Sequence, residues 1–164
     1  MENEKIYNWI KPEFIENGVP EYVFGDFYYP SFKNIFIDAF NKGYDAYDAA
    51  ESLGDFWYLN WTNEVIDLSW DKLTQSTQED LVARNFGKTI KLDIPDDELR
   101  SDIQRDIHKK TPEGENEPIT LIQYPNGLEL MEGWHRTMVI MSSVDNGRHP
   151  STWTPIKINA WIGK

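Results

Sequence analysis

PITLIQYPNGLELMEGWHRTMVI, residues 118–140, contains two short runs in which apolar side chains alternate with others, separated by Pro125-Asn126-Gly127. Alternation with a period of two predicts β-strands, and Asn-Gly is the strongest short signal for a hairpin turn. The second run leads directly into Gly133, and apolar side chains continue beyond it. The stretch therefore predicts a strand, a tight turn, a second strand and a helix that begins at Gly133.

The predicted junction between strand and helix brings several reactive side chains together within residues 132–136. A helix N-terminus presents backbone N–H groups to an anion, and Gly133 lets a phosphate approach closely because it has no Cβ. Arg136 offers a bidentate phosphate contact, His135 a second donor or a proton shuttle, and Glu132 a Mg²⁺ ligand or general base. A structural alternative is an ion pair between Glu132 and Arg136, with His135 as a partly buried residue at the start of the helix.

Residues 88–164 are predicted to follow the order β-α-β-β-α-β. Thr89–Ile94 alternates apolar and polar side chains and predicts a strand. Asp97–Lys110 has apolar side chains at helical spacing, acidic residues in its first turn and basic residues in its last, as the helix dipole favours. The hairpin and its helix follow, and Pro155–Ile162 alternates again and predicts a closing strand.

Residues 1–87 are predicted to form a helical layer. Apolar spacing and turn residues predict helices over residues 31–42, 44–53, 55–66 and 77–86. Thr77 is the expected cap of the last helix, which should end at Gly87. Before them, a short helix is expected to start at Pro12, and Glu21–Tyr29 predicts either a short strand or an aromatic loop. The expected fold is therefore α+β: a helical region, residues 1–87, followed by a domain with a small mixed sheet, residues 88–164.

The octapeptide LMEGWHRT, residues 130–137, resembles the acidic-Gly-x-His-Arg box of the ParB/sulfiredoxin-like superfamily. In that superfamily a strand ends in this box and the next helix cradles a nucleotide phosphate. The order of predicted elements over residues 88–164 is similar as well. The resemblance implies a nucleoside triphosphate, ATP or CTP, bound with Mg²⁺. It implies nucleotide contacts from Gly133, Trp134, His135, Arg136 and Thr137, catalytic roles for Glu132 and His135, and Glu132 as metal ligand.

Two departures from the superfamily narrow the expected activity. Sulfiredoxin has its catalytic cysteine where this chain has Trp134, so repair of peroxiredoxin is excluded. A chromosome-partition protein needs a DNA-reading helical domain after the box, and only 28 residues follow Arg136. We therefore expect a nucleotide-dependent phosphotransferase or hydrolase, with Mg²⁺-dependent phosphoryl transfer or phosphoester chemistry on a small molecule or a protein.

The charge distribution favours a second interpretation. The net charge is −12, and residues 1–86 carry 16 acidic and 6 basic side chains. Such an acidic half argues against duplex DNA as a partner, because binding to its phosphates requires clustered Lys and Arg. It suits a basic protein partner, and in composition the chain is similar to phage and plasmid proteins that mimic DNA. In this second interpretation the box at residues 130–137 is only structural. A third possibility combines the two: the helical region recruits the partner, and the box has become purely structural. The plain alternative to any partner is a merely soluble acidic surface. Without cysteine or an apolar run of membrane-spanning length, a cytoplasmic protein with no membrane partner is expected.

Overall fold

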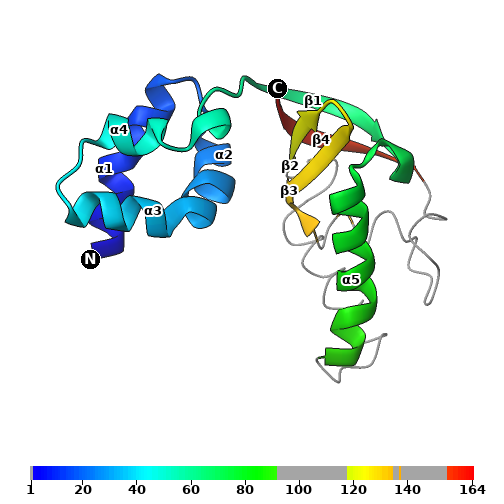
Figure 1. The fold of residues 1–164 in the computed structure, drawn as a ribbon. Coiled ribbons are helices and arrows are strands. Elements are labelled where there is room, and N and C mark those ends of the chain that lie inside the picture. Colours follow the sequence, from blue (N-terminus) through cyan, green and yellow to red (C-terminus); the bar gives the residue numbers. More distant parts are fainter. Residues whose placement is uncertain (1, 92–117, 135–136, 138–154) are drawn as a thin grey trace. The chain divides into compact units, whose positions relative to one another are not determined.

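The computed structural model describes residues 2–91, 118–134, 137 and 155–164. Figure 1 shows helices together with a four-stranded sheet, which confirms the α+β class. The chain divides into two compact units: unit 1 is Met1–Thr62 with Gly163–Lys164, and unit 2 is Asn63–Ile162. The expected change of organisation after residue 87 falls within a helix of unit 2. The helix predicted over residues 97–110 lies outside the described residues. None of the described helices has the length and apolarity needed to cross a membrane.

Unit 1 contains three longer helical segments, α1 (Glu2–Glu16), α3 (Tyr29–Asn41) and α4 (Ala46–Glu51). The last two confirm the helices predicted over residues 31–42 and 44–53, and the Asp45 carboxylate caps α4 by accepting from the Tyr47 N–H, at 2.7 Å. The start predicted for the first helix was wrong, because Pro12 lies inside α1. The helix begins earlier than predicted because its first turns also bury apolar side chains, spaced four residues apart. These side chains are Ile6, Ile10 and Phe14.

Glu21–Tyr29 is neither the strand nor the loop that was predicted. Its first residues form α2 (Glu21–Val23), and Phe24–Tyr28 continues as a π-helical segment into α3. The wider π-helical turn carries Phe24, Phe27 and Tyr28 into the interior, where each is at most 1% exposed. Tertiary packing of these large rings therefore decides the local conformation, and neither helical nor strand periodicity reveals it.

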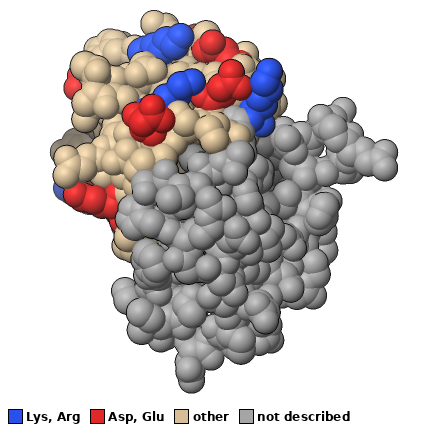
Figure 2. All heavy atoms as spheres, turned by 90° about the vertical axis from the view of Figure 1, so that its right-hand side faces the viewer, with Lys and Arg blue, Asp and Glu red and all other residues tan. Residues whose placement is uncertain are grey.

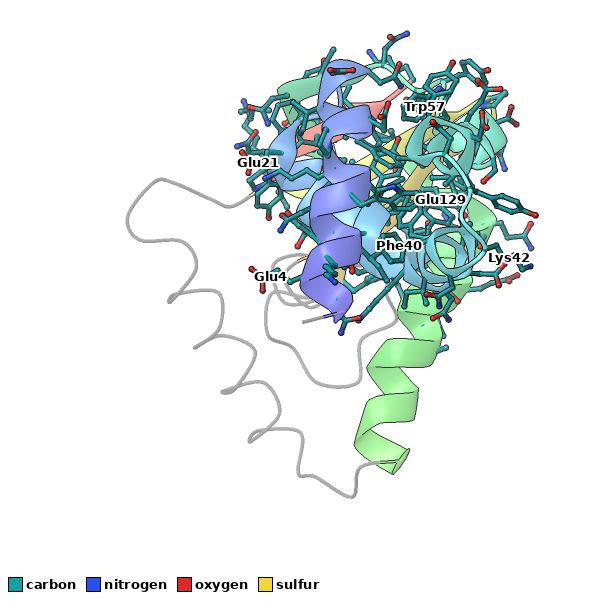
Figure 3. The ribbon with its side chains drawn as sticks, turned by 90° about the vertical axis from the view of Figure 1, so that its left-hand side faces the viewer. Glu4, Glu21, Phe40, Lys42, Trp57 and Glu129 are labelled. Carbon is teal, nitrogen blue, oxygen red and sulfur yellow. The ribbon has the colours of Figure 1, made fainter. Side chains whose placement is uncertain are left out.

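An aromatic cluster forms the core of unit 1. Phe14 of α1 lies at its centre, with ring centroids 4.9–5.8 Å from four other buried rings: Phe24, Tyr28, Phe36 and Trp57. All four pairs are tilted or edge-on, an arrangement that aromatic quadrupoles favour over face-to-face stacking. At the margin, Phe40, labelled in Figure 3, meets Trp9 edge-on at 5.2 Å.

Tyr28 supplies the polar link within this core. Its phenol donates to the Phe56 carbonyl oxygen, at 2.5 Å, and accepts from the indole Nε1–H of Trp61, at 3.0 Å. Burial raises the pKa of the Tyr28 phenol far above its ordinary value near 10, and the hydrogen bond from Trp61 opposes this only in part. The phenol thus stays protonated and joins the π-helical segment to Phe56 and Trp61.

The sheet has the strand order β1-β4-β2-β3. Its strands are β1 (Trp61–Leu68), β2 (Ile119–Tyr124), β3 (Gly127–Glu132) and β4 (Ile156–Gly163). The predicted hairpin is confirmed: β2 and β3 are antiparallel, with Tyr124 opposite Gly127 across the turn. β4 confirms the closing strand. The helix predicted over residues 55–66 is wrong. Gly54–Phe56 forms a short 3₁₀ turn, and the residues from Trp61 onward belong to β1, which pairs with β4; Val65 of this strand is 71% exposed.

Helix α5 (Gln75–Lys91) differs from the prediction at both ends. Thr74, not Thr77, caps it, since the Thr77 N–H donates to Thr74 Oγ1 at 3.2 Å. The helix also continues through Gly87 to Lys91, so the strand predicted over Thr89–Ile94 is wrong for its first residues, and the remainder lies outside the described ones. A single glycine costs a helix only about 1 kcal/mol, which neighbouring helical residues can offset.

The core of unit 2 joins the sheet to α5. Its buried members are Leu68, Leu73, Leu81, Ile119, Leu121, Leu128, Leu130, Ile158, Ala160 and Ile162. Thr77 adds a buried polar link between the two layers, because its Oγ1 accepts from the Leu130 N–H of β3 at 3.0 Å. The first turn of α5 therefore holds β3 shortly before that strand ends.

Tyr28→Phe should lower the free energy of unfolding by about 1–3 kcal/mol, because it leaves the Phe56 carbonyl and the Trp61 indole N–H without their buried partner. The matched control is Tyr44→Phe at a side chain that is 58% exposed, which should change stability by less than about 0.5 kcal/mol. Urea unfolding measures both. Equal effects of the two substitutions would contradict the role given to Tyr28.

The wild type should also lose stability in alkali more steeply than Tyr28→Phe. The pKa of the Tyr28 phenol is raised in the folded state, so its contribution is complete below the unfolded value near 10 and declines as the pH rises above it. Urea midpoints between pH 8 and 11 test this. A parallel decline in wild type and variant would show that Tyr28 is not the group responsible.

Candidate functional site

The predicted junction between strand and helix exists at the residues described. β3 ends at Glu132, Gly133 has a φ of +95°, and the backbone is helical at Trp134 and Thr137. The Thr137 N–H donates to the Gly133 carbonyl at 3.0 Å, which is the first hydrogen bond of a helical turn. A helix that opens in this way directs its first backbone N–H groups along its axis, toward any anion placed there.

Gly133 has a packing reason for lacking a side chain. A Cβ at this position would lie 2.5 Å from Cγ2 and 3.0 Å from Cβ of Ile119, a fully buried residue of β2. From the sequence, the missing Cβ is expected to allow close approach by phosphate. In the structure the space is occupied by Ile119, so the glycine is required whether or not a ligand binds.

Two predicted site residues hold the junction together. Thr137 is fully buried, and its Oγ1 donates to the Gly133 carbonyl oxygen at 2.8 Å, beside the backbone bond to the same oxygen. Trp134 is half-buried, packs against the core of unit 2 and donates from Nε1 to the Met131 carbonyl at 3.3 Å. These side chains fix the exit of β3 and the first helical turn.

Glu132 lies at the end of β3, half-buried, opposite Thr120 of β2. The other two predicted site residues, His135 and Arg136, lie outside the described part of the chain. Within the described ranges no three His, Cys, Asp or Glu side chains are close enough together to hold a metal ion by themselves. A cation here would therefore draw oxygen ligands from the substrate as well, as Mg²⁺ commonly does.

Thr120 is a residue that the sequence reasoning missed. It lies in the apolar run Ile119–Ile122, is fully buried, and its hydroxyl oxygen has no hydrogen-bond partner. The signal was present in the sequence, since a threonine within such a buried run must satisfy its hydroxyl somewhere. Its position opposite Glu132 could not be known before the register of the hairpin was.

Comparison of the chain with protein-family models, with curated proteins and with solved structures finds no match. The function proposed below therefore rests on the geometry of the junction at residues 132–137.

Gly133→Ala should be more destabilising than Gly18→Ala. Both glycines have φ near +90°, but a Cβ at Gly18 meets nothing within 4 Å, whereas one at Gly133 collides with Ile119. Gly18→Ala should cost about 1–2 kcal/mol for the backbone alone, and Gly133→Ala roughly 1–3 kcal/mol more for overpacking. Native-state hydrogen exchange, resolved to peptides, measures the loss in each unit. Equal losses would mean that the contact with Ile119 imposes no constraint.

Proposed function

We propose that the junction at Glu132–Thr137 binds the phosphates of a nucleoside triphosphate, ATP or CTP, together with Mg²⁺. The activity proposed is Mg²⁺-dependent phosphoryl transfer or phosphoester chemistry on a small molecule or a protein. The observation that supports it best is the strand that ends in Glu132, turns at Gly133 and opens a helix whose first turn is secured by Thr137. This arrangement is the one expected for the box of the ParB/sulfiredoxin-like superfamily, which the sequence resembles.

Four residues of the junction share the proposed chemistry. The backbone after Gly133 and the guanidinium of Arg136 hold the phosphates. His135 donates a second hydrogen bond or moves a proton. Glu132 would repel a phosphate directly, so its useful role is as a ligand of Mg²⁺, which bridges carboxylate and phosphate, or as a general base for the attacking group. Positioning and charge neutralisation together account for most catalysis of phosphoryl transfer.

A second candidate function is binding of a basic protein, which the surface around α4 favours. Residues 43–62 contain four acidic side chains and no Lys or Arg; the four, Asp45, Asp48, Glu51 and Asp55, are all exposed. Three exposed tyrosines accompany them, with exposed fractions of 58%, 48% and 67% for Tyr44, Tyr47 and Tyr58. By contrast, acidic and basic side chains are intermingled on the described part of the face in Figure 2. Tyrosines beside charges of one sign suit a partner rich in Lys and Arg.

The nucleotide site predicts a thermal shift that depends on Arg136. A nucleotide present at 100 times its dissociation constant should stabilise the folded protein by about 2.7 kcal/mol and raise its melting temperature. ATP, CTP, GTP and ADP are each titrated with Mg²⁺. At least one of them should raise the melting temperature of the wild type and fail to raise that of Arg136→Ala, while the unliganded melting temperatures stay similar.

Lys157→Ala is the matched control, since it removes one exposed positive charge from β4 and should leave the shift intact. A shift that survives in Arg136→Ala, or the absence of a shift with every nucleotide, would overturn the proposed nucleotide site.

The surface around α4 predicts salt-dependent binding of a Lys- and Arg-rich peptide. Substitution of Tyr44, Tyr47 and Tyr58 together by alanine should weaken binding by at least tenfold, because exposed aromatic side chains supply much of the contact energy of such interfaces. The matched control is Ile15→Ala with Ile35→Ala, which removes exposed apolar side chains elsewhere in unit 1. Calorimetry at 50 and 300 mM salt measures both. If the dissociation constant for the peptide does not change with salt concentration, or does not change in the triple tyrosine variant, this function is excluded.

A further inference from the structure

The two outer strands of the described sheet, β1 and β3, differ in how their edges are covered. The edge of β3 is covered by the segment that leads into α5. The Thr74 N–H donates to the Leu128 carbonyl at 2.9 Å, and Thr77 Oγ1 accepts from the Leu130 N–H at 3.0 Å. On β1, by contrast, residues 62–65 are all exposed. An open sheet edge presents backbone N–H and C=O groups that can pair with a further strand.

The pairing of β1 with β4 decides which backbone groups lie at the open edge. Just before β1, Asn60 exchanges both backbone hydrogen bonds with Lys164, at 3.0 and 2.9 Å, as in an antiparallel ladder. Because such pairs alternate with pairs that share no hydrogen bond, even-numbered residues of β1 direct their backbone groups to β4 and odd-numbered residues direct theirs outward. Lys72 agrees with this alternation, since its Nζ donates to the Asp67 carbonyl oxygen at 2.6 Å. The odd-numbered residues of 61–67 therefore carry the outward N–H and C=O groups.

The covered edge of β3 limits how copies of the chain can associate through their sheets. If β1 of one copy paired with β3 of the next, the contact would repeat and the sheets would grow into an open filament. Thr74 and Thr77 already occupy that edge of β3, so this growth is blocked. The arrangement left to the described strands is β1 against β1, which closes after two copies as an isologous dimer.

The sequence of β1 fits an antiparallel copy of itself. Because the outward groups belong to odd-numbered residues, the numbers of two facing residues must add to an even number. Two such registers overlap nearly the whole strand, one centred on Glu64 and one on Val65. The first opposes two glutamates, and like charges directly opposite are destabilising. In the second, Val65 faces its own copy. Glu64 then faces Ile66, and Asp67 faces Asn63, so no like charges are opposed.

We propose that β1 is a dimer interface, at which β1 of a second copy of this chain adds antiparallel in the register centred on Val65. The two four-stranded sheets then form one continuous sheet across a twofold axis. The centre of the interface is Val65, which is 71% exposed in the single chain. The Asp67 carbonyl has two lone pairs, so it can accept from Lys72 and from the new strand together. This interface does not depend on the proposed nucleotide site.

Sedimentation of the full chain between about 1 and 500 µM tests the interface, since a contact of one strand per copy is small and exchanges readily. The wild type should change from monomer to dimer over this range. Val65→Lys should raise the dissociation constant of the dimer at least tenfold, because it places two ammonium groups opposite each other at the edge. The substituted side chain is already exposed, so the variant should keep the fold and melting temperature of the wild type.

Ile35→Lys is the matched control. It makes the same change of charge at an apolar side chain of α3 that is 46% exposed, and it should dimerise like the wild type. A wild type that stays monomeric throughout the range would overturn the proposed interface. Equal weakening by Val65→Lys and Ile35→Lys would overturn it as well, since net charge and not the edge of β1 would then govern association.

Val65→Cys tests the register independently. The chain has no native cysteine, so the new thiol is unique. In the proposed dimer the two copies of residue 65 form a hydrogen-bonded pair, with Cα atoms about 5.5 Å apart, which a disulfide can span. Under mild oxidation Val65→Cys should form covalent dimers at least tenfold faster than Ile35→Cys or Glu64→Cys, whose thiols do not face each other. Faster cross-linking of Glu64→Cys, or equal rates for Val65→Cys and Ile35→Cys, would overturn the proposal.

Salt distinguishes a second copy from a basic peptide on the same edge. Each copy carries a net charge of −12, so the copies repel, and the dimer should be stronger at about 300 than at about 50 mM salt. A Lys- and Arg-rich peptide would bind more weakly at the higher salt. If the wild type stays monomeric while such a peptide slows amide exchange in residues 62–67, the edge has a different occupant and the proposal fails.

Discussion

The approach of Gly133 to Ile119 is the contact on which the candidate site depends. It requires a residue without Cβ and with positive φ at the point where β3 ends. The turn that results lets Thr137 bind the Gly133 carbonyl through both its backbone and its hydroxyl. A strand end and a helix start are thereby fixed within a few residues of each other. The same packing constraint requires a glycine here whether or not a phosphate binds.

Buried threonines organise unit 2 around that contact. Thr74 caps α5, and Thr77 accepts from the backbone of β3. Thr137 secures the helical turn after the junction. All three have their hydroxyls engaged, and their role is structural. Thr120 differs from these three because its hydroxyl is buried without a hydrogen-bond partner.

Elements with strong local signals could be predicted from the sequence. The hairpin, the closing strand and the helices near residues 31–42 and 44–53 follow from Asn-Gly, from alternation and from an apolar stripe with caps. The errors arise where tertiary packing overrides local pattern. Large rings force Phe24–Tyr28 into a π-helical segment, β1 pairs with β4 although its apolar residues also fit a helix, and α5 continues through Gly87. At the site, Glu132 and the helix start were predictable from residues in sequence order, whereas Thr120 required the register of the hairpin.

Peptide-resolved hydrogen exchange, with and without saturating Mg²⁺–nucleotide, tests the central claim most directly, because it reports where a ligand binds as well as whether it does. If the junction is a working phosphate site, exchange should slow in peptides covering residues 119–137, with little change in residues 43–62. Unchanged exchange at residues 119–137 while a nucleotide is bound would contradict the account, because the ligand would then occupy another part of the protein.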